Sequence, residues 1–292
     1  MRMTAANRVN LATGLYFLAT PIGTARDITL RALDILASAD VLAAEDTRSL
    51  RRLMDIHGIA LDGRPMVAYH DHNGPQARPR IMAALAEGKS VAYASEAGTP
   101  LIADPGYALG RAVAEEGHLV TAAPGPSAVL TALTISGLAT DAFFFAGFAP
   151  TAKGARQSFL RELAEVPGTL VFYESPKRVH KMLDDLLEVY GDREAVVARE
   201  LTKKFEETRK GVLSQLVAEL KGVTLKGEVV VLVARGERSV FDENDMEILL
   251  KDAMQSGSMK DAVATVVAST GLPKRKVYQA ALALEKEQDV ES

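Results

Sequence analysis

The feature that constrains the fold most is a regular alternation of short apolar runs and helical patterns in the first half of the chain. The apolar runs have the length and composition of buried strands, and they cover Leu15–Ala19, Val41–Ala44, Val91–Ser95 and His118–Ala123. Four helical patterns follow these runs. The first begins after Asp27, which can serve as its N-cap, and the second ends at Ile56. The third covers Tyr107–Glu116, and the fourth starts at Ser127. Strands that alternate with helices form a largely parallel sheet, so residues 14–140 are predicted to form an α/β domain.

The second half of the chain predicts a different kind of sheet. Beyond Phe143-Phe144-Phe145, the one clear helical pattern between the strand patterns is Lys177–Val189. The strand patterns cover Thr169–Glu174, Glu194–Glu200, Lys204–Gly211 and Gly227–Val233. Successive strands without helices between them indicate a mixed sheet, so residues 141–238 are predicted to form a second domain of α+β character.

The two ends of the chain predict smaller elements. Helical patterns at Glu243–Gln255, Met259–Ser269 and Lys274–Lys286 predict a helical extension over residues 243–292. The last two, joined by Thr270-Gly271-Leu272-Pro273, resemble a helix-turn-helix with a basic second helix, and a small dimerisation bundle is the alternative. Residues 1–13 carry no apolar stretch, so we predict a flexible tail rather than a signal peptide.

Composition excludes several classes of protein. Among 292 residues, 48% are hydrophobic and 25% charged, which is the balance of a globular chain large enough for two cores. The absence of cysteine excludes disulfide scaffolds and thiolate metal sites, and no metal is expected. A net charge of −4 excludes a basic coat over the whole surface but not a local basic patch. Thr121–Thr140 lies in the longest stretch without a charged residue, and Pro124-Gly125-Pro126 interrupts it, so we expect no membrane span and a cytoplasmic protein.

Familiar nucleotide and hydrolase motifs are missing. No G-x-G-x-x-G follows any strand pattern, which argues against a nicotinamide enzyme. Gly88-Lys89-Ser90 resembles the end of a phosphate-binding loop, but Ala83 stands where the upstream glycine would be required and the triplet leads into a strand. The sequence also contains no G-x-S-x-G.

Loops rich in glycine and proline follow the predicted strands instead. They are Thr20–Gly23, Ser95–Pro100, Asp104–Gly106 and Pro124–Ala128. Ligands of open α/β sheets bind at the carboxyl ends of the strands, where these loops lie. Glycine lets the backbone approach a ligand, proline limits the entropy lost on binding, and a helix starting at Ser127 offers free N–H groups. Each loop alone could be only a turn, but their repetition at one edge of a sheet favours a binding site.

Eight motifs then follow in order: LATPIG, ITLRALDILASADVLAAEDTR, YHDHN, SEAGTPLIADPG, PGPSA, FYESPKR, ARELTK and KGEVVVLV. With them the chain, from Leu15 to Val233, resembles the ribosomal RNA branch of the tetrapyrrole-methylase-like (class III) S-adenosylmethionine-dependent methyltransferases. The resemblance implies two α/β domains with the active-site cleft between them and a small C-terminal helical extension. It also implies a homodimer that methylates the ribose 2′-oxygen of a cytidine in the decoding region of 16S rRNA.

The same resemblance implies which residues touch the cofactor. In the first domain they are Pro21, Ile22, Gly98, Thr99, Pro100, Ile102, Ser127 and Ala128, and in the second Tyr173, Glu174, Gly227 and Glu228. The chain departs from the family pattern at Glu96, where relatives carry aspartate and the carboxylate is retained. It departs again at Gly74, where relatives often carry glutamate.

Methyl transfer from a sulfonium is an in-line displacement that needs alignment, and a ribose hydroxyl benefits from a base or a stabilising cation. The candidates for catalysis are Glu45, Asp46, Arg199, Glu200 and Lys203. Glu45 and Asp46 could equally cap a helix. Adjacent residues on a strand point to opposite faces, so at most one of Arg199 and Glu200 should face the cleft.

Local basic and histidine clusters are the candidates for RNA binding. They comprise Arg48, His70, His72, Lys177, Arg178, Lys204, Lys274, Arg275 and Lys276. Phosphate contacts of this kind give salt-dependent binding without sequence choice. In an acidic protein they suggest a structured target, 16S rRNA within the assembled small subunit. The alternatives are a tetrapyrrole or precorrin methylase on the same scaffold, and a nucleic-acid-binding regulator without turnover.

Overall fold

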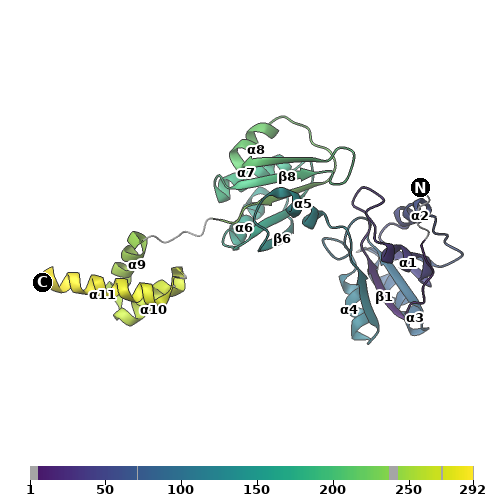
Figure 1. Ribbon diagram of the computed structural model, residues 1–292, viewed down its shortest axis with the longest axis horizontal. Coiled ribbons are helices and arrows are strands. Elements are labelled where there is room, and N and C mark those ends of the chain that lie inside the picture. Colours follow the sequence, from purple (N-terminus) through teal and green to yellow (C-terminus); the bar gives the residue numbers. More distant parts are fainter. Residues whose placement is uncertain (1–5, 71, 237–242, 271, 292) are drawn as a thin grey trace. The chain divides into compact units, whose positions relative to one another are not determined.

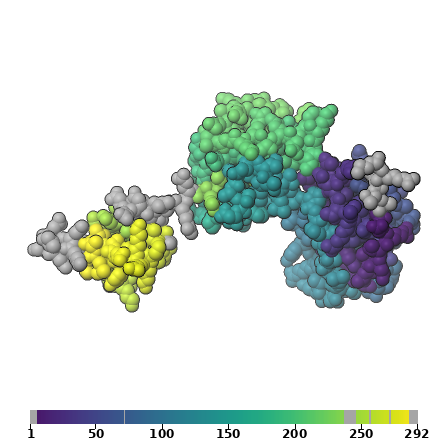
Figure 2. Space-filling model, viewed as in Figure 1, coloured from purple at the N-terminus to yellow at the C-terminus, as the bar shows by residue number. Residues whose placement is uncertain are grey.

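The computed structural model describes residues 6–70, 72–236, 243–270 and 272–291. The chain divides into two compact units, residues 1–236 and 237–292, which are described separately (Figure 1). In the space-filling view the first unit runs from purple to green and the second is yellow (Figure 2). No described helix combines the length and apolar character needed to cross a bilayer.

The first sheet is parallel throughout, in the order β3-β2-β4-β1-β5. Its strands are β1 (Gly14–Leu18), β2 (Val41–Ala44), β3 (Met66–Ala68), β4 (Ser90–Ala94) and β5 (Leu119–Ala123). The helices that follow them are α1 (Leu30–Ser38), α2 (Thr47–Ile56), α3 (Gly74–Ala86), α4 (Tyr107–Glu115) and α5 (Ala128–Ser136). Every residue of β1 is buried, because Tyr16 and Leu18 pack into one core while Leu15 and Phe17 pack into another.

Two details of this sheet differ from the sequence prediction. Thr29, not Asp27, caps α1, and its side chain accepts a hydrogen bond from the backbone N–H of Ala32. The prediction failed because both residue types cap helices and the sequence offers both. The short edge strand β3 and helix α3 were not predicted; α3 contains Pro75 and Pro79, which obscure its pattern.

The second sheet is mixed, as predicted, in the order β6-β7-β10-β8-β9. Its strands are β6 (Phe143–Phe148), β7 (Thr169–Glu174), β8 (Glu194–Arg199), β9 (Glu207–Val212) and β10 (Val229–Val233). Of the neighbouring pairs in this sheet, β6 and β7 are parallel and the other three are antiparallel. One face packs on α6 (Lys153–Leu163), α7 (Val179–Tyr190) and α8 (Leu213–Leu220), and the other on α5. Strand β9 begins later than the predicted Lys204, because turns closed by hydrogen bonds of Lys203 and Glu206 precede it.

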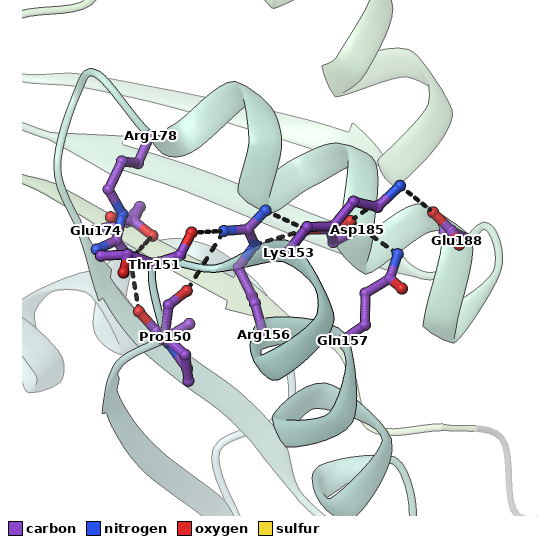
Figure 3. Close-up of polar contacts among 10 residues, drawn as sticks. Pro150, Thr151, Lys153, Arg156, Gln157, Glu174, Arg178, Asp185 and Glu188 are labelled. Carbon is purple, nitrogen blue, oxygen red and sulfur yellow. Dashed lines mark hydrogen bonds and ion pairs between the residues drawn. The ribbon is translucent and has the colours of Figure 1, made fainter.

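A buried polar cluster joins α6 to α7 (Figure 3). Arg156 and Asp185 are 4% and 2% exposed, and Arg156 Nε donates to Asp185 Oδ2 at 2.6 Å. Arg156 Nη1 also donates to the carbonyl of Thr151 at 2.9 Å, and Gln157 Nε2 donates to Asp185 Oδ1 at 3.0 Å. The cluster therefore fixes the connection between β6 and α6 to the helix behind it.

The second unit consists of α9 (Glu243–Ser256), α10 (Met259–Thr270) and α11 (Lys274–Glu291). They surround a small core that includes Leu250, Val263, Val266 and Val277. Gly271, in the predicted turn between the last two helices, lies outside the described residues.

The N-terminal segment was predicted to be a flexible tail over residues 1–13. Residues 1–5 lie outside the described residues, but the rest of the segment is held in place. Backbone N–H groups of Asn7 and Val9 donate to Asp34 and Ser38 on α1, and Thr13 Oγ1 donates to the carbonyl of Gly88. Residues 7–13 therefore follow the surface of the first sheet.

Candidate active site

A cavity of about 680 Å³ lies at the carboxyl ends of the strands of the first sheet and is closed by loops of the second. From the first sheet it is lined by residues 21–23, 45, 49, 96–99, 102–104 and 127–128. From the second it is lined by residues 148, 173–176, 203 and 227–230. Loops far apart in the sequence therefore share one concave surface of the size that small-molecule ligands occupy.

The loops of the first sheet are hydrogen-bonded to one another. The backbone groups of Thr20 and Gly98 exchange two bonds of 2.9 Å, so the loops after β1 and β4 form a short antiparallel bridge. Thr99 Oγ1 donates to the carbonyl of Pro126 at 2.9 Å, which ties the loop after β4 to the loop after β5. These contacts make the first wall of the cavity rigid before any ligand arrives.

The loop after β4 also carries an unusual backbone. Gly98 has φ +83°, and a Cβ there would lie 3.3 Å from the side chain of Ile22. Leu101 and Ala103 have φ of 72° and 59°, a left-handed conformation that residues with side chains seldom adopt. Such strain persists where surrounding contacts enforce it, which is common at ligand-binding loops.

Lys203 is the cation of the cavity and is held by two carboxylates. Its Nζ donates to Glu200 Oε1 at 3.0 Å and to Glu228 Oε2 at 2.9 Å. Burial alone would lower the pKa of Lys203, but the hydrogen bonds to Glu228 and Glu200 outweigh burial and raise it. Lys203 is therefore a fixed positive charge and not a proton acceptor at neutral pH.

Aromatic side chains form part of the second wall. Phe145 and Phe148 contact Tyr173 edge to face, with ring centroids at 4.8 and 5.6 Å. Burial, with a further contribution from the charge of Asp104, raises the pKa of Tyr173 to about 12. Tyr173 is therefore a neutral phenol that can bound a ligand but cannot act as a base at neutral pH.

The charge of the cavity suits a cationic ligand. Its lining includes five carboxylates, of Glu45, Glu96, Asp104, Glu174 and Glu228, against the single amine of Lys203. S-Adenosylmethionine carries one net positive charge through its sulfonium, and an acidic lining favours it electrostatically. The residues present therefore fit this cofactor.

Most of the predicted cofactor residues line this one cavity. Of the twelve, all but the buried Pro100 do so. The sequence prediction missed Phe148, Ser175 and Pro176 among the lining residues. Ser175 and Pro176 belong to the FYESPKR motif, which offered a signal, whereas Phe148 ends an aromatic run whose pattern indicates only a strand.

The predicted catalytic residues separate into two groups. Glu45 and Lys203 line the cavity, and Asp46, Arg199 and Glu200 do not. Asp46 caps α2, and hydrogen bonds from Arg48 lower its pKa to about 2. Arg199 Nε donates to Glu207 at 2.5 Å across the β8–β9 pair.

Glu200 lies beyond the end of the strand on which it was predicted. Strand β8 ends at Arg199, and Glu200 has φ 50°, so alternation between opposite faces does not apply. Its carboxylate lies behind the cavity wall, where it accepts hydrogen bonds from Lys203 Nζ and from the backbone N–H of Glu228 at 3.1 Å. Glu200 therefore positions Lys203 and Glu228.

The predicted RNA-binding residues are dispersed over the described surface. Arg48, His72, Lys177, Lys204 and residues 274–276 at the start of α11 are exposed, and His70 is half-buried. Lys204 Nζ lies 5.5 Å from the ring of Phe205, which is 64% exposed.

The Arg178 side chain makes contacts within the protein. Its Nη2 donates to Glu174 Oε2 at 2.9 Å and to the carbonyl of Ala149 at 2.5 Å, and its side chain is half-buried (Figure 3). Arg178 was assigned to RNA by its basic neighbours in the sequence, whereas these contacts are internal. Its role in RNA binding stays a prediction.

Comparison with known proteins assigns this chain to a family. The family model described as Tetrapyrrole (Corrin/Porphyrin) Methylases matches residues 14–217, and the RsmI C-terminal HTH domain matches residues 241–285. A ribosomal RNA small subunit methyltransferase I of Mesorhizobium japonicum is 45% identical over 276 residues, covering 94% of this chain and 93% of that protein. The chain belongs to this methyltransferase family.

One further relative supports this assignment, and a solved structure shares the fold. The Vibrio cholerae protein of the same name is 42% identical and covers 92% of this chain and 94% of its own. A uroporphyrin-III C-methyl transferase of Thermus thermophilus, solved with S-adenosylhomocysteine, shares the fold at a TM-score of 0.51 and 22% identity, covering 77% of this chain and 97% of that one. The family is one of S-adenosylmethionine-dependent enzymes.

Proposed function

We propose that this enzyme transfers a methyl group from S-adenosylmethionine to the ribose 2′-oxygen of a cytidine in the decoding region of 16S rRNA. The observation that carries the proposal is the acidic cavity between the loops of the two sheets, in a chain whose relatives are named as ribosomal RNA small subunit methyltransferases. We further propose that the substrate is rRNA within the assembled small subunit and that the enzyme works in the cytoplasm.

Each group of residues has a part in this reaction. The bound donor supplies an electrophilic methyl group on a sulfonium. The loops at Pro21, Gly98 and Ser127 hold the adenosyl moiety, and the lining carboxylates stabilise its positive charge. Because the loops are already hydrogen-bonded to one another, the donor is oriented without further ordering of the wall.

The acceptor side is proposed to use Glu45 and Lys203. Glu45, at the end of β2, accepts the proton of the ribose hydroxyl, and the ammonium of Lys203 stabilises the developing negative charge on that oxygen. Glu200 and Glu228 keep Lys203 charged and in place.

A matched pair of variants tests the role of Lys203. Lys203→Met should lower kcat for methyl transfer, whereas Lys204→Met, which removes the neighbouring exposed lysine, should raise the KM for rRNA instead. Equal effects of the two variants on kcat would contradict a role for Lys203 at the reacting oxygen.

We also propose that the enzyme is a homodimer. Strands β5 and β6 are the edges of their sheets, and they expose Leu119, Val120, Phe143 and Phe144 by 37–45%. Large apolar side chains gathered on edge strands are characteristic of association surfaces. Sedimentation equilibrium tests this proposal, and Phe143→Glu should shift the mass to that of a monomer.

The two alternatives make different predictions. A precorrin methylase would transfer label to a tetrapyrrole, and a regulator would bind nucleic acid without turnover. Neither is favoured, because the relatives that cover nine tenths of the chain carry the name of an rRNA methyltransferase.

The deciding experiment supplies labelled methyl donor, purified full-length protein and small subunits that lack the modification. We expect label at the 2′-oxygen of one cytidine of 16S rRNA. Naked 16S rRNA is incubated in parallel. Equal labelling of naked rRNA would contradict the assembled subunit as substrate, and labelling of neither would contradict the proposed reaction.

A further inference from the structure

A second cavity of about 410 Å³ lies next to the first, entirely within the first sheet's half of the unit. Four residues, Pro21, Gly23, Ser49 and Glu96, line both cavities, so the two share a rim. The remaining wall is formed mainly by α2, through Leu53, Ile56 and Arg52. A ligand in the first cavity that continues past this rim would therefore enter the second.

Helix α2 presents three exposed arginines, but only one of them lines this cavity. Arg48 pairs with Asp46 at 2.9 Å, and Arg51 pairs with Asp55 at 3.2 Å. Arg52 has no ion pair or hydrogen bond within the described part of the chain. The arginine at the cavity is thus the one whose guanidinium is available to an anion from solution.

The rest of the wall contributes apolar side chains and a carboxylate. Ile56 is 44% exposed and Leu53 is half-buried, so α2 offers an apolar surface beside Arg52. Glu96, on the rim shared with the first cavity, contributes an exposed carboxylate. An apolar face, a cation and a hydrogen-bond acceptor match the base, the phosphate and the exocyclic amine of a nucleotide.

The cavity is formed before any ligand binds. His57 Nε2 is 2.8 Å from the carbonyl of Ala25, which links the end of α2 to the loop after β1. Thr24 of the same loop is hydrogen-bonded to Thr202 on both its N–H and its hydroxyl, which fixes the loop from the other side. Little ordering is therefore required when a ligand enters.

We propose that this second cavity is a subsite for the nucleotide adjacent to the one that is methylated. Arg52 contacts its phosphate, Leu53 and Ile56 contact its base, and Glu96 accepts a hydrogen bond from a base amine. The inference rests on the proposed function, since it assumes an RNA substrate in the first cavity. It assigns Arg52 a role that its paired neighbours on α2 do not share.

The test compares Arg52→Ala with Arg51→Ala, which removes the same charge from the adjacent position of the same helix. We expect Arg52→Ala to raise the KM for small subunits roughly tenfold. The slope of log KM against the logarithm of the salt concentration should fall by about one. Arg51→Ala should change neither by more than about twofold, because its charge is engaged by Asp55. Ile56→Ala should raise KM without changing the salt dependence.

Affinity for the methyl donor, measured by calorimetry, distinguishes this inference from the proposed function. It should equal the wild-type affinity in all three variants. Equal effects of the two arginine variants on KM, or a loss of donor affinity in Arg52→Ala, would overturn the subsite. Failure of the wild-type enzyme to methylate any RNA would instead overturn the proposed function.

Discussion

Gly227 offers the sharpest test of how the second wall is built. It lines the cavity with φ +83°, and a Cβ at this position would lie 2.1 Å from Glu200 Oε1. Gly227→Ala therefore forces the Glu200 carboxylate to move. That movement breaks its hydrogen bonds to Lys203 Nζ and to the N–H of Glu228.

The magnitude follows from two separate costs. The left-handed backbone costs an alanine about 1–2 kcal/mol wherever it occurs. The two lost hydrogen bonds add about 1 kcal/mol each, since both lie near solvent. If the second cost falls on the donor-bound geometry, about 2 kcal/mol corresponds to a roughly thirtyfold weaker affinity for S-adenosylmethionine.

A second glycine separates the two costs. Gly222 has φ +75°, and nothing lies within 4 Å of the position of its Cβ. Gly222→Ala should therefore lower the stability by the backbone cost alone, about 1–2 kcal/mol, and leave the affinity for the methyl donor unchanged. Calorimetric titration and thermal unfolding of both variants provide the measurement. Equal donor affinities for Gly227→Ala and Gly222→Ala would refute the role of the Glu200 contacts in shaping the wall.

Three further predictions concern the loop after β4, the buried Arg156–Asp185 ion pair and the Glu207 carboxylate between β8 and β9. Thr99→Trp should abolish donor binding, because an indole at Thr99 fills the cavity, and should cost only about 1 kcal/mol of stability through the lost hydrogen bond to Pro126; unchanged affinity in calorimetry would remove the loop from the site. Arg156→Met should cost about 3–5 kcal/mol in urea unfolding, because it removes the buried guanidinium that pairs with the buried carboxylate of Asp185, and adding Asp185→Leu should restore most of the loss; a double variant no more stable than the single one would contradict the charge argument. Hydrogen bonding by Arg199 lowers the pKa of Glu207 from its ordinary 4.5, so its stabilisation is complete above that value and is lost as the pH falls below it. The difference in unfolding temperature between wild type and Glu207→Gln should therefore shrink from about pH 6 to about pH 3, and a difference independent of pH would count against this pair.

The local sequence pattern was sufficient to predict most strands of the first sheet. The fully buried strands β1, β2 and β4 are continuous apolar runs, and glycine and proline punctuate the loops that follow them. By contrast, the three-residue strand β3 has too few residues to show a pattern, and the prolines of α3 disguise a helix.

The sequence indicated some residues of the candidate site but not their contacts. Resemblance to a family indicated the loops at Gly98 and Ser127, because motif residues keep their order along a chain. It could not indicate that Arg178 bonds to Glu174 and Ala149, or that Arg199 bonds to Glu207. The contacts of Arg178 with Ala149 and of Arg199 with Glu207 depend on which strands become neighbours, and the Arg178–Glu174 pair depends on the turn that follows β7.

The sequence by itself determined the alternation of strands and helices, the acidic net charge and the loops where a ligand could bind, because each of these depends on residues close together in the chain. Only the tertiary structure decided which charges are engaged and which are available. Arg51 and Arg52 are adjacent and chemically identical, yet one pairs with Asp55 and the other lines a cavity. The physical reason is that a side chain's partner is set by the direction in which the folded backbone points it, and neighbours on a helix point about 100° apart.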